Sequence, residues 1–263
     1  MMRGLLRTTM PGIVGLALLL PARGQDMMRH LDLTSPEMVG AEMTRADVEA
    51  ALAARRTDFT GRRLSGLDLS GLDLSGAVLR AARLNKTKLV GAKLDRAVLD
   101  QAWLLDADLG GASLKGASIF AAQMQRAKLD GADLTGARIA ADLTGARLVG
   151  ASLAGANLSA DMKNQSMGLM RAVLKSADLT GANLRQADLS RVDLEFASLA
   201  HADLTGASLR GAALGGANLT AVTITDTDFL GADLASARLV APIGLAAARN
   251  FDQAANLERL VRQ

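Results

Sequence analysis

The residue types that most often carry out catalysis or bind metals are scarce in this chain. Histidine occurs only at His30 and His201, and cysteine is absent, which excludes thiolate nucleophiles, disulfides and cysteine-based metal sites. Neither histidine has a partner at metal-ligand spacing. Serine and aspartate are abundant, but they recur at regular positions and form no distinct Ser/His/Asp arrangement. The sequence therefore predicts no enzyme, no cofactor and no metal site.

The glycines and the charge balance exclude two further classes of protein. The glycines recur within a five-residue pattern and form no phosphate-binding loop. The formal net charge is +3, but Arg3, Arg7 and Arg23 precede Gln25, so 27 basic and 27 acidic residues remain from Gln25 onward. A chain without net charge predicts no binding to nucleic acid.

The stretch from Phe59 to Leu239 repeats itself every five residues. From Phe59 to Ile139, 13 of the 17 positions spaced by five are Leu, and 12 of the 17 positions two residues earlier are Ala. A step of five turns ~500° on an α-helix, which scatters the Leu residues around the axis. On a flat strand, an odd step places alternate Leu residues on opposite faces. The pattern instead favours a chain that turns a corner once per unit and so points every Leu inward.

Units such as Ala132-Asp133-Leu134-Thr135-Gly136 and Ala182-Asn183-Leu184-Arg185-Gln186 follow the pattern A-[DN]-L-x-x. This pattern resembles the pentapeptide-repeat family. The resemblance implies an all-β solenoid, namely a right-handed quadrilateral β-helix with four units per coil. Residues 59–240 would then form about nine coils, roughly 43 Å long at ~4.8 Å per coil. We expect short α-helical caps at both the N- and C-terminal ends, because terminal repeats need cover.

Six aspartates of the second half directly precede an inward residue: Asp178, Asp188, Asp193, Asp203, Asp228 and Asp233. They invite comparison with family members that resemble DNA in shape and charge and block gyrase. Basic residues at outward positions of the first half would interrupt an acidic stripe, namely Arg83, Lys88, Lys93, Lys128, Arg138 and Arg147. We therefore expect ordinary solvated carboxylates. A DNA-mimicking inhibitor of DNA gyrase or topoisomerase is the alternative function if the chain is cytoplasmic.

Residues 1–24 have the order of a secretory signal peptide. Arg3 and Arg7 precede an apolar run from Gly12 to Leu20, and Ala22-Arg23-Gly24 fits the small-x-small cleavage pattern. The run is too short to span a bilayer of ~30 Å as a helix. We expect a periplasmic or secreted protein with no stable membrane span after cleavage. The alternatives are a leader retained as an anchor, or a cytoplasmic chain that starts at Met27 or Met28.

Residues 25–58 lack the repeat, and we expect them to form an N-terminal arm with a capping helix. Ser35-Pro36-Glu37 is a helix-start pattern. A second start has Thr44 as the cap and Asp47 three residues later. This helix would run to about Ala54 and cover an imperfect first coil, in which Arg62 occupies an inward position that usually holds Ala.

The period is broken at 139–143 and at 159–170. Leu143 follows Ile139 after four residues, and Ala160-Asp161-Met162 fits a unit that arrives one residue early. Ile139 to Leu174 spans seven whole units, so the slips should cancel. One interpretation is a pair of harmless defects. The other is a projecting loop that contacts a protein partner, with the candidate contact residues Lys163, Asn164, Gln165, Ser166 and Met167.

Residues 241–263 are expected to form a C-terminal helical cap. Asp252 can cap a helix with Leu257, Leu260 and Val261 on one face. That face would seal the last coil or pair with a second copy of the chain as a homodimer. The sequence as a whole predicts a non-catalytic, exported scaffold for protein-protein interaction, with a protein partner of unknown identity and no nucleic acid.

Overall fold

The computed structural model describes residues 32, 35–160 and 170–263. The expected signal peptide at 1–24, His30 and the first part of the arm lie outside the described residues. From Asp32 onward the described residues form one compact unit.

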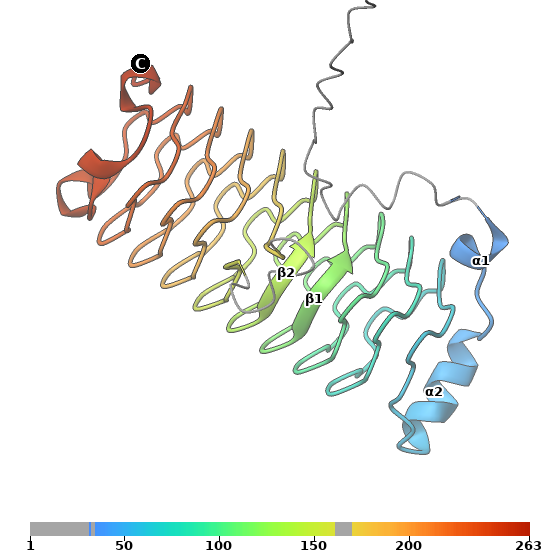
Figure 1. The fold of residues 1–263 in the computed structure, drawn as a ribbon. Helices are drawn as coiled ribbons and strands as arrows, with labels where there is room; N and C mark the ends of the chain where they lie inside the picture. The colour runs from blue at the N-terminus through green and yellow to red at the C-terminus, as the bar shows by residue number, and fades with distance from the viewer. Residues whose placement is uncertain (1–31, 33–34, 161–169) are drawn as a thin grey trace, which may run out of the picture. The chain divides into compact units, whose positions relative to one another are not determined.

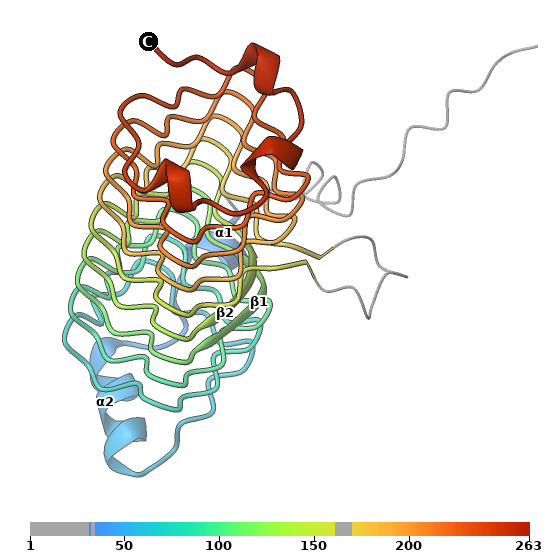
Figure 2. The same ribbon diagram turned by 90° about the vertical axis from the view of Figure 1, so that its left-hand side faces the viewer.

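Residues 58–160 and 170–239 wind into a right-handed quadrilateral β-helix (Figures 1 and 2). Parallel bridges join residues twenty apart, such as Asp58 with Val78 and Val78 with Val98, so four units complete a coil. The described strands are β1 (Ser118–Gln123) and β2 (Arg138–Asp142), which pair in parallel on adjacent coils. We number the faces by their first bridged residue: face 1 from Asp58, face 2 from Arg63, face 3 from Asp68 and face 4 from Asp73. Each edge is named by the two faces that it joins.

The five-residue step works because the corner of each regular unit contains a residue with positive φ. In the unit centred on Leu79, Ala81 has φ 54° and the N–H of Ala82 donates to the carbonyl of Leu79 at 3.1 Å. This turn directs both Ala82 and Leu84 inward, and both are fully buried. The same alternation of buried Leu and Ala continues along the solenoid, so the predicted core is confirmed.

The aspartate or asparagine of each unit has a structural role. The carboxylate of Asp133 accepts the N–H of Thr135 at 3.0 Å, and Asp188 accepts the N–H of Ser190 at 3.0 Å. The side chain thus satisfies a backbone donor at the corner, which the neighbouring coil leaves unpaired. This explains why Asp and Asn precede so many of the inward Leu residues.

Two helices precede the first coil, α1 (Pro36–Val39) and α2 (Arg45–Ala53). Thr44 caps α2 through a reciprocal pair of hydrogen bonds with Asp47, at 2.8 and 3.2 Å. Val48 and Ala51 of α2 belong to the hydrophobic core. Arg62 is exposed and pairs with Glu42 at 3.4 Å, so the first coil is imperfect at the position where the sequence indicates it.

The predicted C-terminal α-helix is wrong. Residues 241–263 contain three 3-10 turns, η3 (Leu245–Ala247), η4 (Phe251–Gln253) and η5 (Leu257–Arg259). Each turn follows a left-handed residue, namely Gly244, Asn250 or Asn256, and ends in extended backbone. The chain must return to the ladder every six residues, because Ile243, Arg249, Ala255 and Val261 all pair with the preceding coil. A longer helix cannot satisfy these bridges.

Candidate protein interface

The two breaks of the period lie on the same edge of the solenoid, one coil apart. The first break shortens the corner between faces 1 and 2 by one residue, so that later bridges join residues 19 apart, such as Lys128 with Arg147. The shift occurs between Phe120 and Gln123 of β1. Ala140 and Ala141 at the shortened corner of β2 are buried. The shortened corner therefore has only buried residues from Ile139 to Ala141.

The second break is an insertion at edge 1–2 of the next coil. Asn157 and Val173 begin consecutive faces, since both pair within the ladder, and the step of 16 residues from one to the other replaces the usual step of five. Eleven residues are therefore additional. The N–H of Ala172 still donates to the carbonyl of Leu158 at 3.3 Å, which closes the corner beneath the insertion.

This geometry corrects the unit count from the sequence. The seven units between Ile139 and Leu174 are five in the structure, because two units' worth of residues leaves the coil. The slips do cancel in phase, since one residue lost and eleven gained change the count by ten. Spacing alone could not separate two coil units from an insertion of nearly the same length.

The candidate contact residues Lys163, Asn164, Gln165, Ser166 and Met167 lie outside the described residues. What the structure describes is the base of the insertion. Arg171 donates to the carbonyl of Arg191 at 3.2 Å and lies 3.5 Å from the carboxylate of Asp193. These contacts fix the returning strand against the next coil.

Across face 2 from the insertion, an aromatic side chain stands at edge 2–3. Phe196 is 61% exposed, the highest value among the large apolar residues that the structure describes as exposed. Its ring lies over Gly216 of the next coil, and the ammonium group of Lys175 lies 5.5 Å from the ring centroid. Lys175 also pairs with Glu195 at 2.6 Å. Sequence reasoning missed Phe196, although it is an aromatic residue at a corner position that usually holds Gly or a polar residue.

The six aspartates of the second half do not form a free acidic stripe. Asp178, Asp188 and Asp193 accept backbone N–H groups two residues later, at 3.0 or 3.1 Å. Asp203 pairs with Arg185 at 2.9 Å and Asp228 pairs with Arg210 at 2.9 Å. Asp228 is buried, contrary to the expectation of a solvated carboxylate. Burial raises its pKa, but the Asn250 amide, the Leu230 N–H and Arg210 outweigh this and lower the pKa overall.

The described residues show no group of side chains suited to a metal ion. His201 is exposed at a corner with φ 60°, as the sequence predicts. Among the described helices, none has the length and apolar character needed to cross a bilayer.

A family model for pentapeptide repeats matches eight copies in this chain, over residues 63–101, 106–136, 139–160, 169–206 and 202–239. The chain belongs to the pentapeptide-repeat family. No curated protein sequence matches it.

Three solved structures of pentapeptide-repeat proteins are similar to this chain. HetL of the cyanobacterium Nostoc, which is involved in heterocyst differentiation regulation, is 30% identical; the match covers 77% of this chain and 93% of HetL, with a TM-score of 0.46. QnrB1, a plasmid-mediated fluoroquinolone resistance protein, is 21% identical over 72% of this chain and 80% of QnrB1, with a TM-score of 0.31. A protein of the Arabidopsis thaliana thylakoid lumen is 24% identical over 49% of this chain and 66% of its own, with a TM-score of 0.26.

Proposed function

We propose that this pentapeptide-repeat protein is a non-catalytic, exported scaffold of about nine coils that binds another envelope or extracellular protein through edge 1–2. The observation that carries this proposal is that the deletion and the insertion share this edge on adjacent coils. A regular solenoid offers a partner nearly the same backbone at every coil. A shortened corner beside an insertion distinguishes one place on it, and loops on rigid scaffolds often carry recognition.

In this proposal the contact residues are Lys163, Asn164, Gln165, Ser166 and Met167. Phe196 supports the same surface, because it borders face 2 opposite the insertion and exposed aromatic side chains are enriched at the centres of interfaces. Its ring is already held by Gly216 and Lys175, so little side-chain freedom would be lost on binding.

A deletion tests the role of the insertion without disturbing the coil. Removing residues 161–171 takes out the eleven additional residues and restores the step of five between Leu158 and Leu174. The corner would then hold Ala160, a residue type that the solenoid accepts with positive φ at Ala81 and Ala121. We expect an unchanged circular dichroism spectrum and thermal midpoint, together with loss of partner binding in the native host.

Site-specific photo-crosslinking in the native host provides the readout. A crosslinking residue at position 164 should give an adduct of defined mass, whereas one at position 201, on an exposed regular corner, should not. Adducts of equal yield from both positions, or none from position 164, would show that the insertion is not the contact surface.

Export rests on the leader pattern of residues 1–24. We expect the protein in the periplasmic or secreted fraction, with a mature N-terminus at Gln25. Fractionation with mass determination of the N-terminus tests this. A cytoplasmic chain beginning at Met1, Met27 or Met28 would contradict export.

The second function, inhibition of gyrase or topoisomerase by DNA mimicry, needs a cytoplasmic chain and a continuous acidic face. The ion pairs and corner hydrogen bonds of the outward aspartates disfavour such a face. We expect no inhibition in a gyrase supercoiling assay at micromolar protein, and inhibition there would favour this function over the scaffold.

We also propose that a second copy of the chain can pack on the C-terminal end.

A further inference from the structure

The positive charge of the solenoid is concentrated at its N-terminal end. Residues 55–96 contain ten Lys and Arg but only four Asp, whereas residues 97–160 and 170–239 together contain 11 basic and 14 acidic residues. Further along the solenoid, cations pair with carboxylates of adjacent coils, as Arg126 does with Asp106 at 2.7 Å. The first two coils are therefore basic, whereas the later coils are slightly acidic.

Three cations of this end lie along edge 4–1. Arg55, Arg56 and Arg96 are exposed, and the structure gives their side chains no hydrogen bond or ion pair within the described residues. Arg96 is a corner residue of edge 4–1, twenty positions after the corner residue Gly76. Arg56 belongs to the same edge, because the next residue, Thr57, accepts the N–H of Val78 at 2.9 Å.

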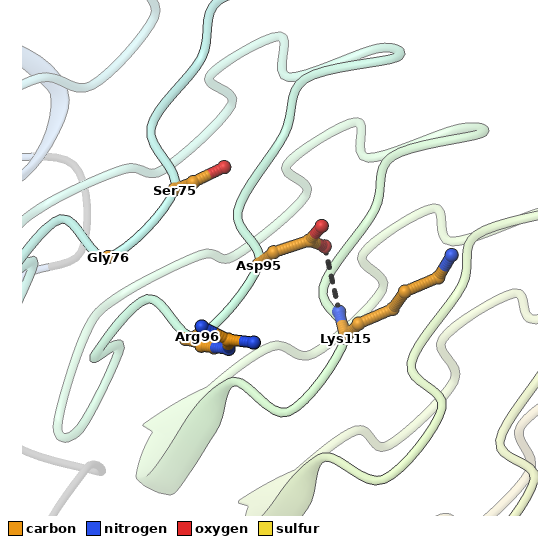
Figure 3. Close-up of a pocket in the computed structure, with 5 residues that line it drawn as sticks. All are labelled: Ser75, Gly76, Asp95, Arg96 and Lys115. Carbon is orange, nitrogen blue, oxygen red and sulfur yellow. Dashed lines mark hydrogen bonds between the residues drawn. The ribbon is translucent and has the colours of Figure 1, made fainter.

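Beside Arg96 the edge is hollowed. Gly76 has open space where a Cβ would stand, and Ser75, Gly76, Asp95, Arg96 and Lys115 line a hollow of about 470 Å³ (Figure 3). The one carboxylate in this lining is already engaged, because Asp95 accepts the Ser113 hydroxyl and the N–H of Lys115 at 3.1 Å. Lys115 pairs with Asp133 at 3.1 Å. The guanidinium of Arg96 is the charged group that the hollow leaves for a ligand.

We propose that this edge, formed by Arg55, Arg56, Arg96 and the hollow at Gly76, binds an anionic phospholipid surface. Unpaired cations spaced along an outer edge of the solenoid are complementary to a flat field of negative charge, whereas an enclosed site would be needed to hold one small anion. A lipid phosphate can enter the hollow and accept hydrogen bonds from Arg96. This surface is separate from edge 1–2, so a bound partner and a bound membrane can occupy the protein together.

Vesicle co-sedimentation of the full chain tests the proposal. Vesicles of phosphatidylglycerol and phosphatidylcholine are compared with vesicles of phosphatidylcholine alone, in 0.05 and 0.15 M salt. We expect binding to the anionic vesicles that weakens at the higher salt concentration. Each cation at an anionic surface is worth about fivefold in affinity, so R55Q/R56Q/R96Q should bind at least ~10-fold more weakly.

A triple variant of equal charge provides the control. Arg238, Arg259 and Arg262 are also exposed, and they too have no side-chain partner within the described residues, but they lie at the C-terminal end. R238Q/R259Q/R262Q should bind anionic vesicles within about twofold of the unmodified chain. If both triple variants bound anionic vesicles equally weakly, the affinity would depend only on the net charge of the chain, and the proposal would be overturned.

Two other results would also overturn it. Equal binding to phosphatidylcholine vesicles would indicate insertion of the apolar leader, which all variants share. Tighter binding to a DNA duplex than to anionic vesicles would assign the edge to nucleic acid. The comparison requires that both triple variants fold like the unmodified chain. We expect unchanged circular dichroism spectra and thermal midpoints, because Gln retains the part of the Arg96 stem that lies 3.8 Å from the Cβ position of Gly116.

Discussion

The aspartates that precede the inward residues make the stability of the solenoid depend on pH. The Thr60 hydroxyl and N–H lower the pKa of Asp58, and Ser70 and Ser75 do the same for Asp68 and Asp73. A folded-state pKa below the unfolded value contributes stability that is complete above the ordinary carboxyl pKa of about 3.9. That contribution disappears as the pH falls through the lowered folded pKa. The urea midpoint should therefore be constant from about pH 8 to 5 and fall below about pH 4.

Substitution of these aspartates by asparagine distinguishes the effect of carboxylate protonation from the effect of the corner hydrogen bond. D58N/D68N/D73N keeps a side-chain oxygen for each corner N–H but has no carboxylate to protonate. We expect this variant to show a smaller loss of stability between pH 5 and 3 than the unmodified chain. An identical pH profile would mean that other groups dominate acid unfolding.

Gly216 matters for a reason different from its positive φ. A Cβ there would lie 2.6 Å from the Phe196 ring, whereas Gly231 has the same φ of 67° and open space. Ala should cost about 1 kcal/mol at Gly231 for the left-handed backbone. At Gly216 it should cost about 1–3 kcal/mol more, because the ring must move. Urea denaturation of G216A and G231A, with and without F196A, measures this, and the extra cost should vanish in F196A.

The N-terminal helix gives a prediction for one element. T44A removes the hydroxyl that accepts the N–H of Asp47 and should cost about 1 kcal/mol of helix stability. Since α2 buries Val48 in the core, amides of the first coil should exchange faster in T44A. Because each coil contacts only its neighbours, amides near Leu219 should be unaffected. Uniform acceleration along the chain would contradict the role of α2 as a local cap.

The main elements could be predicted because they depend on spacing. The step of five with alternating Leu and Ala is incompatible with a helix or a flat strand, so it predicts a chain that turns a corner once per unit. Thr44 and Asp47 marked the start of α2 through the chemistry of their side chains alone. The sequence of these segments is sufficient to predict their structure, because both the repeat unit and the start of α2 depend on contacts between residues that are close in the sequence.

The remaining features depend on which residues return to the ladder. The sequence predicts the break at 159–170 but counts seven units between Ile139 and Leu174, because an insertion of nearly two units' length keeps the phase. The bridge of Asn157 with Asp188 shows that only five of these units belong to the coil. At the C-terminus, Leu257 and Leu260 suggested a helix, whereas Gly244, Asn250 and Asn256 mark a six-residue step. Gly and Asn tolerate positive φ, so the spacing of these three residues indicates the six-residue step. The spacing of the two Leu residues favours a helix instead, and that prediction is wrong.

The whole solenoid must close its hydrophobic core at two ends, and the C-terminal end does so incompletely. Phe251 packs against Phe229 at 5.2 Å between ring centroids, and Leu257 and Leu260 also contact the core. Ile243 and Leu245 remain 57% and 40% exposed on the same coil. Adjacent apolar side chains at one end of a molecule favour self-association, because a twofold axis would bury both copies of the surface.

We therefore expect a dimer in light scattering that dissociates in I243S/L245S. V90S supplies the control, because Val90 is similarly exposed at 44% but lies on a side edge of the solenoid. The thermal midpoint of the dimer should rise with protein concentration, since association stabilises the folded state by mass action. A monomer at every concentration tested would mean that η3, η4 and η5 seal the core without a partner. Dissociation by V90S as well would place the contact along the sides of the solenoid.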